Sequence, residues 1–293
     1  MSAPAGYALD AERIGTDDRR AVTDTWAVPF RWICSLRITY ATGPAGRGTG
    51  LLVGPRQVLT AAHCLYRKSD GAGPVTVEVI PGRSGRTFPV GTFTASTFSV
   101  PSAFLTTPPG SAMKVRAGSA VDVAMITLDR DIDRIVPAGR PAGQMLGHWG
   151  HPQLGQRTRM RALGSDFLKG RPVTVCGYPT DRCGREVRGA QCDRRDFASV
   201  PFVHHGTVSF AATLPGRLLY DADTFEGQSG APVWLRTTDG SRYLAGIHLG
   251  ARVLRDAKTG LNLPVTANKA RHLDADTLTL IRSWMPDLTG VSR

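Results

Sequence analysis

The sequence predicts an all-β protein built from antiparallel strands, either a barrel or a sandwich, and three observations support that prediction. Short apolar stretches rich in Val, Ile, Leu and Thr recur along the chain, and Gly, Pro and Asp bound most of them. Between these stretches there is no long stripe of apolar residues at helical spacing, which the helices of a parallel sheet would require. The 293 residues also include 33 Gly and 20 Pro, a content that suits a compact, turn-rich chain.

Eight stretches of strand length make up the predicted sheets. In chain order they are residues 32–40, 48–54, 75–80, 122–128, 171–178, 204–210, 231–235 and 243–250. Residues 131–170 lie between the fourth stretch and the fifth, and they are rich in Gly, Pro and Arg. We therefore expect a long connection there between two β-rich halves.

One helix is predicted, and it lies near the C-terminus. Within "HLDADTLTLIRSWM", residues 272–285, Leu278, Ile281 and Met285 recur at helical spacing. Asp274 or Asp276 is expected to cap its first turn, because a carboxylate there accepts hydrogen bonds from free backbone N–H groups.

Charge and hydropathy exclude several classes of partner. The formal net charge is +12, but the Arg residues are scattered and no nucleic-acid-binding motif is present, so no nucleic-acid partner is expected. No apolar run reaches the roughly 18 residues that span a membrane. The first residues, "MSAPAGYALDAERIG", lack the apolar segment of a signal peptide. The chain as written is expected in the cytoplasm, or outside the cell if a leader was removed.

The five cysteines, an odd number, leave at least one thiol free or paired between chains. They are Cys34, Cys64, Cys176, Cys183 and Cys192. The last three lie close together, and a loop disulfide between Cys176 and Cys183 is one pairing that we consider. Their spacing is wider than that of zinc ligands two to four residues apart. "HWGH" places His148 and His151 in a Gly/Pro-rich loop without a metalloprotease motif. We expect no metal and no cofactor.

Three segments carry residues suited to nucleophilic catalysis. In "DTFEGQSGAP", residues 223–232, glycines surround Ser229. A serine hydroxyl is a poor nucleophile at neutral pH and needs a base to take its proton. His63 in "VLTAAHC" follows an apolar run and could be that base, while Asp122 in "VDVAMITL" could hold the imidazole in one tautomer. The order His63, Asp122, Ser229 is that of the chymotrypsin type, and it predicts a catalytic triad.

The same segments resemble a known family. "LTAAHC", "DVAMITL" and "GQSGAP" are similar to the signature segments of chymotrypsin-like serine peptidases. "YDADTFEGQSGAPVW" and "LAGIHLGA" resemble the bacterial glutamyl endopeptidase branch, as do "IGTDDRRAVTDTWAVPFRWIC", "LGHWGHP" and "VTVCGYPTDRCG". The resemblance extends from about residue 14 to the C-terminus.

The resemblance implies two six-stranded antiparallel β-barrels (chymotrypsin/trypsin-like) with a short C-terminal helix. The first barrel would span about residues 30–130, the connection about 131–170, the second barrel about 171–270 and the helix about 273–285. Residues 14–293 would form the peptidase domain, and residues 1–13 would be an extension or a short propeptide cleaved after Arg13. A monomer is expected.

The resemblance also assigns roles to individual residues. Backbone N–H groups of Gly227 and Ser229 would form the oxyanion hole, and Thr224 and His248 would bind a glutamate side chain before the cleaved bond. An imidazole N–H and a hydroxyl can both donate to a carboxylate. The expected partner is therefore a protein or peptide substrate with acidic residues.

Two departures from the family leave alternatives open. Glu226 stands where the family often has a small residue, and a carboxylate facing the pocket would favour Lys or Arg instead. Gly48 lies where the family has the cysteine that pairs with the residue after the catalytic histidine, so Cys64 lacks that partner and Cys34 is a candidate substitute. The alternatives to a glutamyl peptidase are a trypsin-like peptidase of other specificity and a non-catalytic binding module on the same fold.

Overall fold

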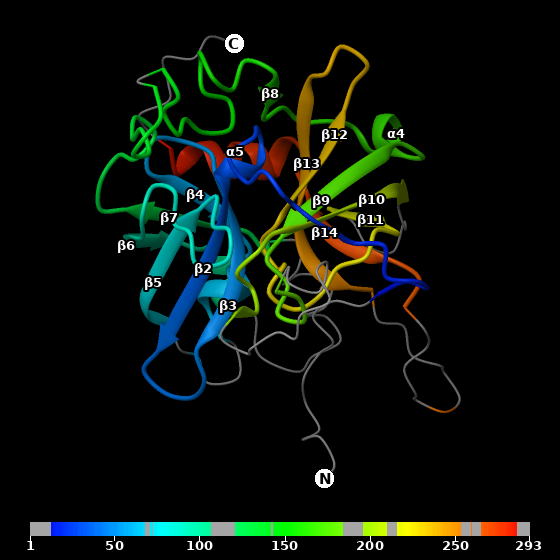
Figure 1. Cartoon of the computed structure of the whole chain (residues 1–293). Helices are drawn as coiled ribbons and strands as arrows, with labels where there is room; N and C mark the ends of the chain where they lie inside the picture. Colours follow the sequence, from blue (N-terminus) through cyan, green and yellow to red (C-terminus); the bar gives the residue numbers. More distant parts are fainter. Residues whose placement is uncertain are drawn as a thin grey trace.

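The first half of the protein is a closed antiparallel barrel. The structure, a computed structural model, describes residues 13–67, 71, 73–106, 121–141, 143–183, 196–209, 216–252, 259 and 265–285. Six strands close in the order β2-β3-β4-β7-β6-β5 (Figure 1). Their bounds are β2 (Ile33–Tyr40), β3 (Gly46–Leu52), β4 (Gln57–Thr60), β5 (Pro74–Pro81), β6 (Phe93–Ser99) and β7 (Ala124–Leu128).

Six further strands form a second closed barrel. They are β9 (Pro172–Gly177), β10 (Phe202–Ser209), β11 (Arg217–Tyr220), β12 (Pro232–Arg236), β13 (Arg242–Ala251) and β14 (Asn268–His272). The ring runs β10-β11-β14-β13-β12-β9 and closes because β9 also pairs with β10. Two short strands extend it: β1 (Arg20–Ala21) pairs with β10, and β8 (Thr158–Arg159) runs parallel to β13. The expected fold of two six-stranded barrels is confirmed.

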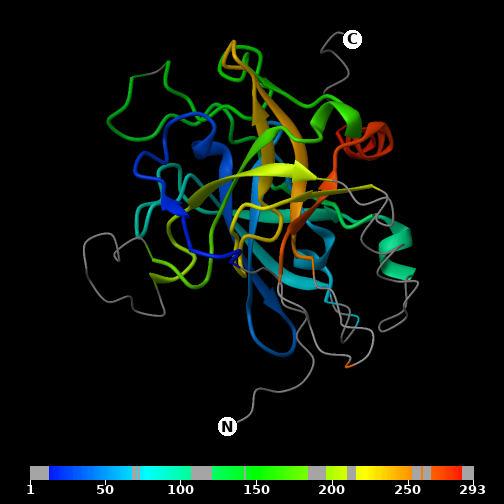
Figure 2. The same cartoon turned by 90° about the vertical axis from the view of Figure 1, so that its right-hand side faces the viewer.

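The barrels stand side by side, as the blue-to-cyan and the green-to-orange strands show in Figure 1, and Figure 2 gives the view at right angles. Apolar side chains from both barrels contribute to one continuous buried cluster. At the contact between the barrels, Trp149 of the connection lies edge-on to Trp32 and to Trp234, with ring centroids 6.4 Å and 6.3 Å apart. The connection therefore supplies core residues that tie the barrels together.

Among the described residues, the helices are few and short. They are a 3₁₀ turn η1 (Phe30–Trp32), α1 (Ala62–Leu65), α2 (Ser102–Thr106), α4 (Ser165–Leu168) and α5 (Ala275–Ser283). Asp274 caps α5 by accepting a hydrogen bond from the Thr277 N–H at 2.8 Å, so it is the capping residue of the two that we considered. Within the described ranges, no helix is long and apolar enough to cross a membrane.

Helix α5 (red in Figures 1 and 2) follows the second barrel in the chain and packs with the buried cluster that both barrels share. Ile281 and Met285 belong to the same cluster as Leu52 of β3 and Met125 of β7. The Met285 Cε would lie 3.3 Å from a Cβ built on Gly54, which follows β3. The C-terminal helix that the sequence predicts is thus confirmed, and it completes a core built mostly from residues far away in the sequence.

The bonding state of the cysteines differs from the disulfide pairing that the sequence suggested. Cys34, Cys64 and Cys176 are free and buried. Cys183 is disulfide-bonded, so the expected Cys176–Cys183 pair is wrong. Cys176 is on β9 and its side chain is fully buried, whereas Cys183 lies beyond the end of that strand. Cys192 falls outside the described residues. Burial raises the pKa of the Cys34 and Cys176 thiols well above the ordinary value.

Gly48 offers Cys64 a partner if it is changed to cysteine. A Cβ atom built on Gly48 would lie 3.2 Å from the Cys64 Sγ, a separation close to that across a disulfide. We predict that Gly48→Cys forms this bond and stabilises the fold by about 3 kcal/mol, because a cross-link over a short loop restricts the unfolded chain. Thermal unfolding with and without reductant measures the gain. Gly48→Ser is the control. The same melting temperature for Gly48→Cys with and without reductant would contradict the prediction.

Candidate active site

Strand pairing brings His63 and Asp122 together. His63 is on α1 immediately after β4, and Asp122 precedes β7. These strands are neighbours in the first barrel, with Thr60 opposite Ala124. The two side chains therefore leave the same edge of the barrel, from segments 59 residues apart in the chain.

Asp122 holds the His63 ring in one tautomer. The His63 Nδ1 lies 2.8 Å from the Asp122 Oδ2, and the His63 backbone N–H donates to Oδ1 at 3.0 Å. Because a carboxylate only accepts, Nδ1 carries the proton and Nε2 of the neutral ring keeps its lone pair. Among the described residues Nε2 has no hydrogen-bond partner. This nitrogen is therefore free to accept a proton.

The pair shifts both pKa values. Burial alone would lower the pKa of His63, but the charge and hydrogen bond of Asp122 outweigh it and raise this pKa well above 6.5. Burial alone would likewise raise the pKa of Asp122, but the charge and hydrogen bonds of His63 lower it below 3.8. The imidazolium is thus stabilised, and the carboxylate stays ionised.

Ser229 lies in a turn that only glycine permits at two positions. Gly227 and Gly230 have φ angles of 89° and 85°. A Cβ on Gly227 would lie 2.5 Å from the Tyr178 carbonyl oxygen, and a Cβ on Gly230 would lie 2.1 Å from that of Thr49. Gly230 therefore lets the turn fit tightly against the first barrel, and Gly227 lets it fit against the segment that follows β9 of the second barrel.

Thr49 of β3 fixes this turn from the opposite barrel. Its backbone N–H donates to the Ser229 carbonyl at 2.8 Å, and its hydroxyl donates to the Gly227 carbonyl at 2.8 Å. With these two carbonyls bound to the first barrel, the N–H groups of Gly227 and Ser229 donate no hydrogen bond to any described residue. Two adjacent backbone donors are thus left available for a developing oxyanion.

Ser229 and His63, the predicted nucleophile and base, are not hydrogen-bonded to each other. Ser229 is buried, and the structure has no bond between its hydroxyl and the His63 Nε2. The Cys64 thiol, next to His63 in the chain, donates to the Ser229 carbonyl at 3.5 Å. The turn and the imidazole are therefore neighbours, and the bond between their reacting atoms is one that free enzymes often lack.

Thr224 and His248, the expected pocket residues, are both fully buried. The Thr224 Oγ1 and the His248 Nε2 have no hydrogen-bond partner in the described part of the chain. A buried polar group without a partner is costly, so two of them next to the serine turn indicate a missing acceptor. Glu226, by contrast, is exposed. It does not share the burial of the two pocket residues.

His248 is neutral in this environment. Burial lowers its pKa to about 3, and the positive charges of His63 and Lys269 act in the same direction. The Tyr220 hydroxyl contacts the His248 Nδ1 from the far side of the ring. The sequence does not single out Tyr220 and Thr49, because they contact the site from strands whose proximity no local pattern reveals. Asp223 lies in the serine segment itself, but only the structure shows its contact with the Ile14 N–H.

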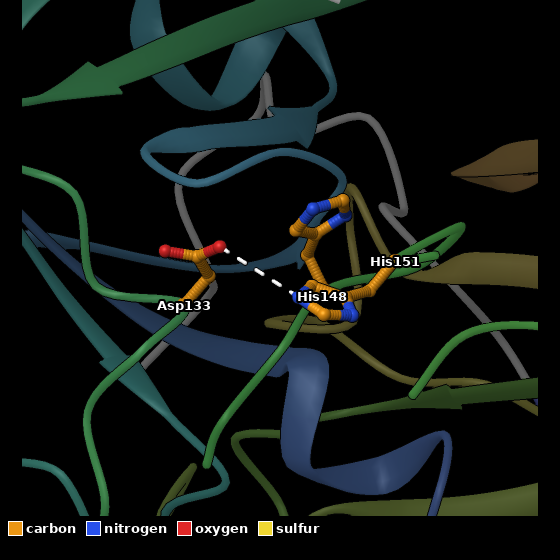
Figure 3. A group of neighbouring side chains, drawn as sticks. All are labelled: Asp133, His148 and His151. Carbon is orange, nitrogen blue, oxygen red and sulfur yellow. Dashed lines mark ion pairs between the residues drawn. The ribbon is translucent and has the colours of Figure 1, made fainter. Parts of the chain in front are cut away.

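One other group of described residues has the composition of a metal site. Ligand-type atoms of Asp133, His148 and His151 lie within 4.8 Å of one another, and all three residues are buried (Figure 3). The His148 Nδ1 lies 3.0 Å from the Trp149 carbonyl, which leaves its Nε2 ready to ligate.

His151 is oriented differently, and its tautomer opposes metal binding. Its Nδ1 accepts two backbone N–H groups of the following turn, each at 3.2 Å, so Nε2 carries the proton of the neutral ring. That nitrogen faces the Asp133 Oδ2 at 3.9 Å, the dashed line in Figure 3. Coordination by all three residues would require this proton to leave a neutral imidazole, so the set as it stands does not suit an ion.

Comparisons with known proteins agree with the fold and show the family. Residues 48–241 match the family described as the trypsin-like peptidase domain. The chain is 30% identical over 233 residues to a glutamyl endopeptidase of Bacillus licheniformis, covering 79% of this chain and 57% of that protein. It is 26% identical over 252 residues to an extracellular metalloprotease of Bacillus subtilis, covering 83% of this chain and 66% of that one. The chain spans less than two thirds of the length of these relatives.

Solved structures share the fold. A Glu endopeptidase in complex with MPD superposes with a TM-score of 0.63 at 22% identity, covering 94% of this chain and 99% of that one. The protease Anisep from Arthrobacter nicotinovorans gives 0.55 at 16% identity, covering 86% and 93%. At such identities the likeness establishes the architecture alone.

The His63–Asp122 pair predicts a measurable titration. Because the Asp122 charge stabilises the imidazolium, the pKa of His63 observed by NMR should lie above 6.5 and fall in Asp122→Asn. Asp131→Asn, the same change at an exposed carboxylate near Arg56, serves as control and should leave the midpoint unchanged. Equal midpoints in Asp122→Asn and the wild type would contradict the proposed coupling.

Proposed function

Since the chain belongs to the trypsin-like peptidase domain family, we propose that it is a serine endopeptidase that cleaves after glutamate through an acyl-enzyme. The observation that carries the proposal is the His63–Asp122 pair, with a proton-accepting Nε2, beside the glycine turn of Ser229. The substrate is a protein or peptide chain.

The proposed mechanism uses only groups of this chain. The Ser229 oxygen attacks the carbonyl carbon of the substrate while its proton moves to the His63 Nε2. The N–H groups of Gly227 and Ser229 bind the resulting oxyanion. His63 then gives the proton to the departing amine, the C–N bond breaks, and an ester to Ser229 remains. A water molecule repeats the attack with His63 as base and releases the acid.

Thr224 and His248 support a preference for glutamate. Each has a buried polar atom without a partner among the described residues, and a carboxylate could accept from both. A hydrogen bond to a charged group contributes about 1.5–3 kcal/mol. The exposed position of Glu226 weakens the alternative of a pocket for Lys or Arg. The glycine turn, fitted against Thr49 with two free donors, weakens the alternative of a non-catalytic module.

A scan of P1 residues with fluorogenic peptides tests the proposal. We expect cleavage after Glu, lost by about a millionfold in Ser229→Ala and lowered about tenfold to a hundredfold in Thr224→Val, which removes one hydroxyl at constant shape. A fluorophosphonate probe should label the wild type and not Ser229→Ala. The activity should survive a metal chelator.

Other outcomes of the scan would reject parts of the proposal. Cleavage after Lys or Arg would retain the mechanism and overturn the pocket. Activity that a chelator abolishes would favour the metalloprotease named among the relatives. A fully folded wild type without activity or labelling would mean either a zymogen that awaits cleavage or the binding module, and cleavage after Arg13 would separate the two.

We also propose that residues 1–13 are removed and that residues 14–293 form the mature domain. Arg13 is exposed, and the Ile14 N–H donates to the Asp223 Oδ1 at 2.6 Å. Asp223 is buried next to Thr224, and its neighbour His204 accepts a backbone N–H on Nδ1, so that nitrogen carries no proton. Cleavage would turn the Ile14 amide into an ammonium, which would pair with this carboxylate and order the pocket wall.

Cleavage can be checked on the protein itself. We expect active protein to begin at Ile14 by intact mass, and Arg13→Gln to stay uncleaved with lower kcat/KM. Asp223→Asn should remove the higher kcat/KM of the cleaved form over the uncleaved one, because the ammonium of Ile14 then lacks its carboxylate partner. An intact Met1 or Ser2 on fully active protein would disprove the proposal.

A further inference from the structure

A fully buried tyrosine lies behind the candidate pocket histidine. The Tyr220 hydroxyl is hydrogen-bonded to the His248 Nδ1, and the two rings meet edge-on with centroids 6.1 Å apart. Tyr220 is on β11 and His248 on β13, with β14 between them. Both side chains are essentially inaccessible to solvent, so water cannot replace either partner of this bond.

The hydrogen-bond inventory selects one tautomer of His248. If Nδ1 carried the proton, the Tyr220 hydroxyl hydrogen would have no acceptor in the described structure, and the His248 Nε2 would keep an unpaired lone pair. If Tyr220 donates to Nδ1 instead, both of those groups are satisfied, and only the Nε2–H is left without a partner. Because buried unsatisfied groups are costly, the second arrangement is favoured.

We propose that Tyr220 is a positioning residue that fixes His248 as the Nε2–H tautomer, so that the pocket presents donors and selects a carboxylate over a carboxamide. The inference rests on the proposed function, since it concerns the side chain that the pocket would bind. Neutrality of the ring supports it: burial lowers the pKa of His248 to about 3, so the ring acts as a neutral donor and tautomer choice governs recognition.

The discrimination follows from the two side chains compared. A glutamate carboxylate accepts from both the His248 Nε2–H and the Thr224 hydroxyl. A glutamine of the same shape has one acceptor oxygen and an NH₂ group, and the NH₂ would meet a donor. With the other tautomer, the Nε2 lone pair would accept from that NH₂. Loss of the Tyr220 hydroxyl should therefore reduce the difference in kcat/KM between the glutamate and the glutamine substrate.

The decisive experiment compares kcat/KM for matched peptides with Glu or Gln before the cleaved bond. We expect Tyr220→Phe to lower the Glu-to-Gln ratio about tenfold to a hundredfold, mostly through loss on the Glu peptide. Tyr178→Phe is the matched control, because its hydroxyl is equally buried but donates to carbonyls of Ile33 and Arg83 in the first barrel. It should leave the ratio unchanged.

A second measurement separates this inference from the proposed function. In ¹⁵N-edited NMR of the wild type, the His248 Nε2 should show the shift of a protonated nitrogen and Nδ1 that of an acceptor, and Tyr220→Phe should weaken this preference. A wild type that prefers another P1 residue but has this tautomer would overturn the glutamate pocket and leave the role of Tyr220 in place. Protonation at Nδ1, or an unchanged Glu-to-Gln ratio in Tyr220→Phe, would overturn the inference.

Discussion

The contact of Thr49 with the serine turn is the interaction on which the candidate site depends. One residue of β3 donates to two carbonyls of the second barrel, at Ser229 and Gly227, and its hydroxyl also accepts from the Tyr178 N–H at 3.0 Å. Each barrel is rigid because its sheet is closed, so the relative position of the barrels is set where they meet. Thr49 makes that meeting point coincide with the turn, so the turn of Ser229 on the second barrel is held against the barrel that carries His63.

Two histidines of the site show how environment determines the role of one residue type. His63 faces the Asp122 carboxylate, which stabilises its protonated form. His248 faces a tyrosine hydroxyl in a fully buried position, where no carboxylate compensates for the loss of water. The first ring is suited to exchange protons, and the second to remain neutral while it donates a hydrogen bond. The positive charge of His63 also lowers the pKa of His248, which reinforces this difference between the two rings.

The sequence predicts the fold and the α5 cap well, because strand length, turn residues and apolar spacing are local properties. It also predicts the segments of His63, Asp122 and Ser229, whose contact depends on β4 pairing with β7 and on the contact between the barrels; their catalytic roles remain predictions. The sequence could not identify Tyr220, because its contact with His248 arises only when β11 and β13 are placed on either side of β14. The Cys176–Cys183 expectation failed because nearness in sequence does not bring two thiols into bonding geometry: Cys176 is fully buried on β9, and Cys183 lies beyond the end of that strand.

The packing of α5 has a consequence for the order in which the molecule is completed. Ile281 and Met285 belong to the buried cluster that both barrels share, although they are synthesised after the whole second barrel. During translation, part of the apolar surface of this cluster therefore stays uncovered until the C-terminal helix emerges. Since the same cluster joins the two barrels, the candidate site between them is completed only after α5 has been made. The fold thus links assembly of the candidate site to the synthesis of α5.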